Sequence, residues 1–223
     1  KRVFQCKDLC GYNKKTGKVN EEIISTNIKE LILHIRKYQE YLYHIIRTPN
    51  GPQSDIVIEN FVKNIGKNIT YYKYDKESDI KDINNILEVE PKKHTFIFIK
   101  EKLRCAKTLS KRYLGVIYER FTKIPDDSVI TQGGIGRGTG YDDNGISIYF
   151  TNIESIERYE KLWKTNFEDK TVKWKSKTTT NKNNVLESKG TYNNPSLIKG
   201  MSVIRSEEIE NPKGIIKKSS FDD

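Results

Sequence analysis

Apolar residues recur along most of the chain in two patterns, one spaced like the face of a helix and one like a buried strand. A spacing near 3.6 residues predicts helices. The helices are expected over residues 21–38, 54–65, 78–90 and 152–163. Short runs rich in Val, Ile, Tyr and Phe predict strands. The strands are expected over residues 41–47, 68–74, 95–99, 115–118 and 146–150.

Strands and helices therefore alternate over about residues 41–165. Because parallel strands need a long crossover connection, this alternation predicts an α/β domain with a parallel sheet and helices on both faces. Ligands of such sheets bind beside the carboxyl ends of the strands. Segments 100–108 and 131–141 follow predicted strands there. We expect a helical stretch through Leu103 and Leu109, and a loop over the glycines of 131–141.

Composition divides the chain into three regions. Residues 1–40 hold a basic, turn-rich segment and the first predicted helix, and we expect them to link an upstream domain to the sheet. Residues 41–167 form the α/β domain. Residues 168–223 turn to Lys, Thr, Asn and Ser, which predicts a poorly ordered basic tail. The chain opens at Lys1 and has a single Met, so we expect it to be a piece of a longer polypeptide.

Basic residues outnumber acidic ones, with 40 Lys and Arg against 30 Asp and Glu and a formal net charge of +10. This balance favours a polyanionic partner such as DNA or RNA, although coding by A+T-rich DNA also raises the lysine content. No window approaches the ~20 apolar residues of a membrane span, and the start of the chain lacks a secretory apolar core. We therefore expect a soluble, intracellular protein without membrane contact.

The cysteines and histidines predict neither a disulfide framework nor a metal site. Cys6, Cys10 and Cys105 are an odd number for a disulfide framework. No second Cys or His pair at ligand spacing completes a zinc site with Cys6 and Cys10, so we predict no metal site. The three histidines fall on a helix, within a strand and at a strand entry, which favours structural or solvated roles.

The segment 131–141 places one arginine, Arg137, among five glycines. Glycine lets the backbone approach a bulky ligand, and an arginine held there can bind two phosphate oxygens. The glycines around Arg137 stand two residues apart, so the Gly-x-Gly-x-x-Gly register of dinucleotide-binding proteins is absent. No Gly-Lys-Ser/Thr occurs anywhere in the chain, which excludes a Walker A loop.

A basic segment, residues 100–109, follows the predicted strand 95–99. By itself this segment has an ordinary interpretation, in which Lys102, Arg104 and Lys107 form a solvated helix face. The glycines of 131–141 would then be a flexible loop.

Together and in this order, the two segments resemble motifs V and VI of the second RecA-like domain of superfamily 2 helicases and related translocases. Thr95 to Leu109, with Leu-Arg-x-Ala-Lys-Thr-Leu, resembles motif V. Val129 to Tyr141, with Gln-Gly-x-x-Gly-Arg-x-x-Gly-Tyr, resembles motif VI. The sequences of these two motifs are similar to those of helicase-like proteins of large DNA viruses and phages. The resemblance covers about residues 41–165 and implies a RecA-like sheet.

The resemblance also implies roles for individual residues. Arg137 falls on the arginine finger that reaches the γ-phosphate of a nucleotide, and Gln132 falls on the leading polar residue of motif VI, one residue farther from the arginine than usual. Gly136 would lie beside the nucleotide, as would Ala106 and Thr108 of motif V. The basic side chains of motif V would grip nucleic acid, namely those of Lys102, Arg104 and Lys107.

The function implied is that of the C-terminal motor domain of an ATP-dependent helicase or translocase acting on DNA or RNA. ATP and Mg²⁺ would be bound mainly by an upstream RecA-like domain of the same polypeptide, so the chain alone would hydrolyse no ATP. Gly140 stands where the family has a second arginine. Two alternatives stay open: a non-catalytic nucleic-acid-binding α/β module, and a nucleotide-binding transferase that uses loop 133–140. We expect the protein in the cytoplasm, a viral factory or a virion.

Overall fold

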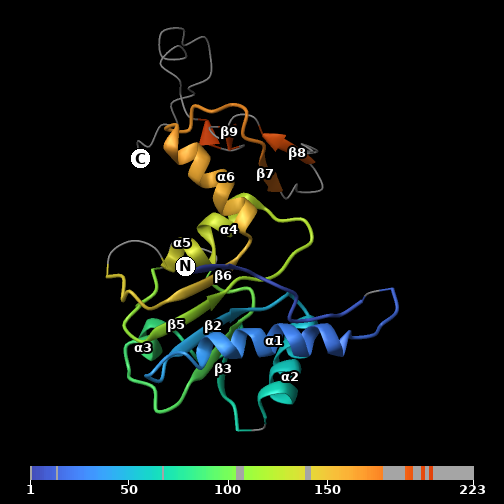
Figure 1. Cartoon of the computed structure of the whole chain (residues 1–223), viewed down its shortest axis with the longest axis vertical. Coiled ribbons are helices and arrows are strands. Elements are labelled where there is room, and N and C mark those ends of the chain that lie inside the picture. Colours follow the sequence, from blue (N-terminus) through green and yellow to red (C-terminus); the bar gives the residue numbers. More distant parts are fainter. Residues whose placement is uncertain are drawn as a thin grey trace, which may run out of the picture.

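A computed structural model describes residues 2–13, 15–66, 68–103, 108–138 and 142–177, with the backbone of three short strands farther on. Its centre is a six-stranded sheet in which all neighbouring strands are parallel. The strand order is β1-β6-β5-β2-β4-β3 (Figure 1). The strands are β1 (Val3–Gln5), β2 (Tyr43–Arg47), β3 (Thr70–Tyr74), β4 (Thr95–Ile99), β5 (Leu114–Tyr118) and β6 (Ile148–Thr151).

Helices cover both faces of the sheet, which confirms the predicted α/β class. Phe96 and Phe98 of β4 pack in the core shared with α1 and α2, whereas Ile97 and Ile99 pack on the other side with α3. Successive side chains of a strand point to opposite faces, so the apolar run in β4 supplies both cores. The helices are α1 (Glu21–Ile35), α2 (Gln53–Ile65), α3 (Asn84–Leu87), α4 (Asp127–Gln132), α5 (Gly134–Gly138) and α6 (Ile153–Lys164).

The amino-terminal residues belong to the same sheet. β1 forms an edge strand beside β6, and the Cys6 N–H extends this pairing to the Thr151 carbonyl at 2.8 Å. Leu9 and the apolar face of α1 are buried in the core that Ile46 of β2 also joins. The expected division at residue 40 therefore does not separate two cores. A strand of three residues is too short to show an apolar period, which is why the sequence pattern misses it.

Two predicted helices differ from the structure. The helix expected from residue 78 is confined to α3, because the Ser78 hydroxyl accepts the Asp75 N–H and donates to the Asp75 carbonyl, which forms a turn instead. The helical stretch through Leu103 and Leu109 is wrong in the described residues 101–103 and 108–110. There Glu101 and Leu103 have φ angles of 57° and 58°, which a right-handed helix cannot contain.

Beyond the sheet, α6 starts directly after β6 and projects away from the strands, with α4 between it and the sheet (Figure 1). Two antiparallel pairs follow, β7 (Trp174–Lys177) with β8 (Lys189–Tyr192) and β9 (Leu197–Ile198) with β10 (Met201–Ser202). The predicted poorly ordered tail lies largely outside the described residues. Among the helices that the structure describes, none has the length and apolar character to cross a membrane.

Candidate functional site

The connections between strands diverge on either side of β2. After β2 the chain builds β3 and β4 on one side, whereas β5 and β6 lie on the other. In open parallel sheets such a switch point leaves a crevice at the carboxyl ends of the strands, and ligands bind there. Arg47 ends β2 and Glu119 directly follows β5 at this place.

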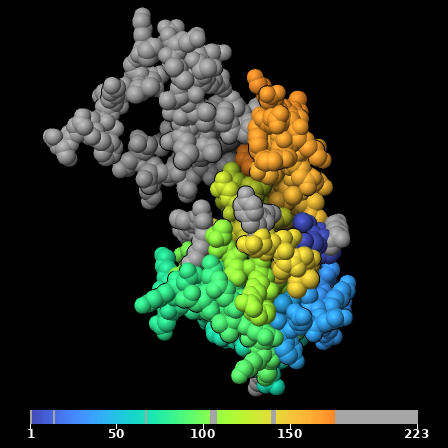
Figure 2. Space-filling model, turned by 90° about the vertical axis from the view of Figure 1, so that its left-hand side faces the viewer, coloured from blue at the N-terminus to red at the C-terminus, as the bar shows by residue number. Residues whose placement is uncertain are grey.

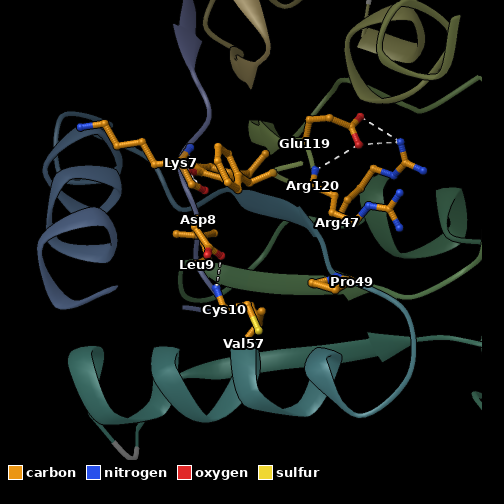
Figure 3. A pocket seen from close by; sticks show the side chains of 11 residues that line it. Lys7, Asp8, Leu9, Cys10, Arg47, Pro49, Val57, Glu119 and Arg120 are labelled. Atoms are coloured by element: carbon orange, nitrogen blue, oxygen red, sulfur yellow. Dashed lines mark hydrogen bonds and ion pairs between the residues drawn. The ribbon is translucent and has the colours of Figure 1, made fainter. Parts of the chain in front are cut away.

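An ion pair joins the two strands at the switch point (Figure 3). Nη1 of Arg47 donates to both carboxylate oxygens of Glu119 at 2.8 Å. The Glu119 carboxylate also accepts the backbone N–H groups of Arg120 at 3.0 Å and of Gly134 at 2.9 Å. The Glu119 side chain is only 3% exposed and that of Arg47 21%. Glu119 therefore holds β2, β5 and the start of α5 together through one buried charge.

A small cavity lies beside this ion pair (Figure 3). Arg47, Glu119 and Arg120 line one wall, and the segment from Lys7 to Cys10 that crosses the sheet edge lines the other. The cavity volume is about 20 Å³, which is room for about one water molecule. This cavity is therefore far too small for a nucleotide.

The buried thiol of Cys6, which senses the charge of Glu119, is not a nucleophile. Burial, together with the nearby negative charge of Glu119, raises the pKa of Cys6 to about 12. The thiol therefore stays protonated at neutral pH, whereas attack requires the thiolate. Burial likewise raises the pKa of Tyr118, whose hydroxyl donates to the Lys7 carbonyl at 2.9 Å.

The glycine segment is helical, so the predicted loop is wrong. The Asp126 side chain caps α4 by accepting the Val129 N–H, and α5 follows after Gly133. A Cβ on Gly133 would lie 2.6 Å from Nη1 of Arg47 and 2.8 Å from a carboxylate oxygen of Glu119. Such distances leave no room for a side chain, so Gly133 allows the helices to pack directly on the ion pair.

A second glycine has a similar packing role. A Cβ on Gly138 would lie 2.1 Å from the ring of Tyr149 in β6. The Tyr149 hydroxyl donates to the Gly138 carbonyl at 2.7 Å. The glycines that suggest close approach to a phosphate thus bring α4 and α5 close to the sheet itself.

Arg137 lies at the junction of α4 and α5. Its Nη1 donates to the carbonyl oxygens of Gln132 at 3.0 Å and Gly133 at 2.9 Å. These carbonyls end α4, where a cation is favourable. The Gly133 carbonyl thus accepts from Arg137, and the absence of a side chain on Gly133 leaves room for the guanidinium group of Arg47. Gln132 is exposed, as is Gly136 on α5.

The motif V-like residues that are described lie on the other side of β2. Lys102 follows β4, and its ammonium group lies 4.5 Å from the centre of the Tyr74 ring. Thr108 is exposed, and its carbonyl accepts a hydrogen bond from the Asn84 side chain at 3.1 Å. Because β4 and β5 are the two neighbours of β2, both motif-like segments follow strands at the same edge. The other three predicted residues lie outside the described residues, namely Arg104, Ala106 and Lys107.

Sequence reasoning missed the buried charges that organise this edge. Besides Arg47 and Glu119, the side chain of Asp127 in α4 is completely buried and bonds to Ser155 and Arg158 of α6. Glu119 could have been found from the sequence, because a charged residue that directly follows an apolar strand indicates a buried charge at the carboxyl end of the sheet. No local signal identifies Asp127, because its partners lie about thirty residues away along the chain.

Part of the chain is similar to a protein of a large DNA virus. A segment is 32% identical over 105 residues to "Uncharacterized protein L594" of Acanthamoeba polyphaga mimivirus. The match covers 44% of this chain and 26% of the viral protein, so the chain spans about a quarter of that relative. No protein-family model matches the chain.

Proposed function

We propose that the chain is the C-terminal motor domain of an ATP-dependent nucleic-acid helicase or translocase. In this proposal an upstream RecA-like domain of the same polypeptide binds ATP and Mg²⁺, and Arg137 completes its site. The observation that carries the proposal is the position of Arg137 on α5, whose first residue, Gly134, donates its N–H to Glu119 at the switch point of the sheet. The cavity beside the Arg47–Glu119 ion pair holds about 20 Å³, as expected for one half of a site that needs a second domain.

The two arginines have different tasks in this proposal. Arg47 is balanced by the Glu119 carboxylate, so it supports the edge. Arg137 contacts carbonyl oxygens at the end of α4, from where a planar cation could face a neighbouring domain. A bound ATP would supply a γ-phosphoryl group whose charge spreads over its oxygens during transfer. An arginine finger that neutralises this charge accelerates hydrolysis by about 10³–10⁵.

Glu119 is a positioning residue for the same site. Its carboxylate accepts the Gly134 N–H at 2.9 Å, and this glycine is the first residue of the helix that carries Arg137. Since an arginine finger acts only when its geometry is fixed, the hydrogen bond supports the role of Arg137. The wider charge of the chain, +10, favours DNA or RNA as the track of such a motor.

The principal alternative is a non-catalytic nucleic-acid-binding α/β module. The contacts of Arg137 with the end of α4 favour this alternative, because the side chain already has a structural task. The match to a mimivirus protein supports a viral origin, and in this proposal the protein acts in the cytoplasm, a viral factory or a virion.

The test uses the parent polypeptide and its ATPase activity in the presence of DNA or RNA. The residues encoded before Lys1 should include a Gly-Lys-Ser/Thr loop and an Asp-Glu acidic box; an intact gene without them would refute the motor. Arg137→Ala should lower nucleic-acid-stimulated turnover by about 10³-fold or more and leave static binding largely intact. Arg137→Lys keeps the positive charge but loses the planar guanidinium group that can bind two phosphate oxygens. Its turnover should therefore be as low as that of Arg137→Ala. A turnover unchanged in both variants would assign Arg137 to structure alone.

A further inference from the structure

Four aromatic side chains form a connected group on α6 and the residues after it. The Tyr159 ring centre lies 6.5 Å from that of Trp163, 5.9 Å from that of Phe167 and 6.3 Å from that of Trp174. Trp163 and Phe167 also meet edge to face at 6.1 Å. We call these four residues the α6 aromatic cluster. It belongs to the orange surface that stands above the sheet and its helices in Figure 2.

The cluster is exposed to an unusual degree for aromatic residues. Trp163 is 64% exposed, Phe167 41% and Tyr159 36%. Single exposed apolar residues are ordinary, but a contiguous group of large ones marks an interaction surface. The exposed faces of these rings are therefore available for a partner.

The cluster is also held rigidly. The buried Asp127 carboxylate accepts the Ser155 hydroxyl at 2.6 Å, the Arg158 guanidinium at 2.7 and 2.8 Å, and the Lys175 N–H at 2.8 Å. The carboxylate also holds the pKa of Arg158 above its ordinary value. Trp174 adds a hydrogen bond from its ring nitrogen to the Ser128 hydroxyl at 3.1 Å. Both sides of the cluster are thus fixed to α4, so little ordering is needed on binding.

Lysines are interspersed with the cluster residues along the chain and indicate what the cluster binds. The stretch 159–175 contains five lysines and three acidic residues, and one of these acids, Asp169, is engaged by Thr171 through its backbone and hydroxyl groups. All five lysines are exposed, namely Lys161, Lys164, Lys170, Lys173 and Lys175. Aromatic rings interleaved with lysines are what unpaired nucleic acid requires, because bases stack on the rings while phosphates meet the cations.

We propose that the α6 aromatic cluster is a stacking platform for unpaired bases of single-stranded nucleic acid. Trp163 provides the principal stacking face, and the exposed lysines of the stretch 159–175 contact the phosphates. This inference rests on the proposed function only in taking nucleic acid as the partner. It places the contact on α6, away from the motif V-like segment, and requires no ATP.

The test measures binding of short oligo(dT) and oligo(U) to the present chain without nucleotide. Trp163 and Trp174 are its two tryptophans, so stacking should quench the intrinsic fluorescence of the unaltered protein. Trp163→Ala should weaken binding about 5- to 100-fold, and Trp163→Phe should restore most of it. The double variant Lys164→Gln/Lys173→Gln should bind with a weaker salt dependence. The slope of log K against log salt concentration should become shallower by about 0.7 for each lysine removed. Quenching by either oligonucleotide supports the platform.

The matched control is Leu33→Ala, which removes a 59% exposed apolar side chain from α1 and should leave binding unchanged. Because Trp163 is largely exposed, far-UV circular dichroism and the thermal midpoint of Trp163→Ala should match those of the parent. Absence of quenching, or equal binding by Trp163→Ala and the parent, would overturn the platform. So would self-association that Trp163→Ala abolishes while oligonucleotide binding persists, since the cluster would then join two copies of the chain. Failure of the motor proposal appears separately, in the turnover of Arg137→Ala.

Discussion

The ion pair between Arg47 and Glu119 gives the sharpest test of how the candidate site is built. Glu119→Gln keeps the shape of the side chain but removes the charge that balances Arg47 and orders the Gly134 N–H. Removing one partner of a buried pair costs about 3–5 kcal/mol. We expect the low end, about 3 kcal/mol, because Arg47 remains 21% exposed and partly solvated. A domain of this size should then lose about 6–12 °C in its thermal midpoint.

The assay is urea and thermal unfolding of the parent and the variant. Glu154→Gln is the matched control, since Glu154 is 70% exposed and lies 3.6 Å from Arg158; its free energy of unfolding should change by less than about 0.5 kcal/mol. In a double-mutant cycle, Arg47→Met combined with Glu119→Gln should lose less stability than the sum of the single changes, by at least about 1 kcal/mol. A loss below about 1 kcal/mol for Glu119→Gln would refute the argument that this carboxylate holds the edge together.

Two further predictions concern buried polar groups. Burial and the neighbouring His94 hold the pKa of His44 well below its ordinary value, so the unfolded chain binds a proton more readily and stability should fall as pH drops below about 6.5. Unfolding measured from pH 7.5 to 5 checks this. The free energy of unfolding of His44→Gln should fall less with decreasing pH than that of the parent, and an equal pH dependence of the two proteins would contradict the prediction. Asp127→Asn weakens the bonds to Ser155 and Arg158 and should cost about 3 kcal/mol. Limited proteolysis should then cut near α6 faster, whereas an unchanged cleavage pattern would show that other contacts hold α6 in place.

Much of the fold follows from the sequence because its long elements carry clear periods. The apolar run 95–99 predicts β4, and the 3.6-residue spacing of residues 152–163 predicts α6, since both depend on burial of one element against a neighbour. The short elements escape this reasoning. β1 has three residues, and α3 has four because the turn at Ser78 delays it.

The candidate site was harder to predict because its key contacts join distant residues. Sequence reasoning selected the segment around Arg137, and the structure places it at the switch point. The packing of Gly133 depends on Arg47 and Glu119, which are 72 residues apart along the chain. The roles of Arg137 and Gln132 in nucleotide chemistry stay predictions, as does the phosphate grip expected of Lys102.

The bond from the Lys175 backbone to the Asp127 carboxylate makes one amide hydrogen a reporter of motion. This hydrogen can exchange with solvent only when the strand that carries it separates from α4, and the same separation releases Trp174. Its exchange rate therefore measures how often this part of the molecule opens, relative to the amides of the central strands, which open only on global unfolding. A bound oligonucleotide that slows exchange at Lys175 without affecting β2 would locate the nucleic acid on this face from a single resonance.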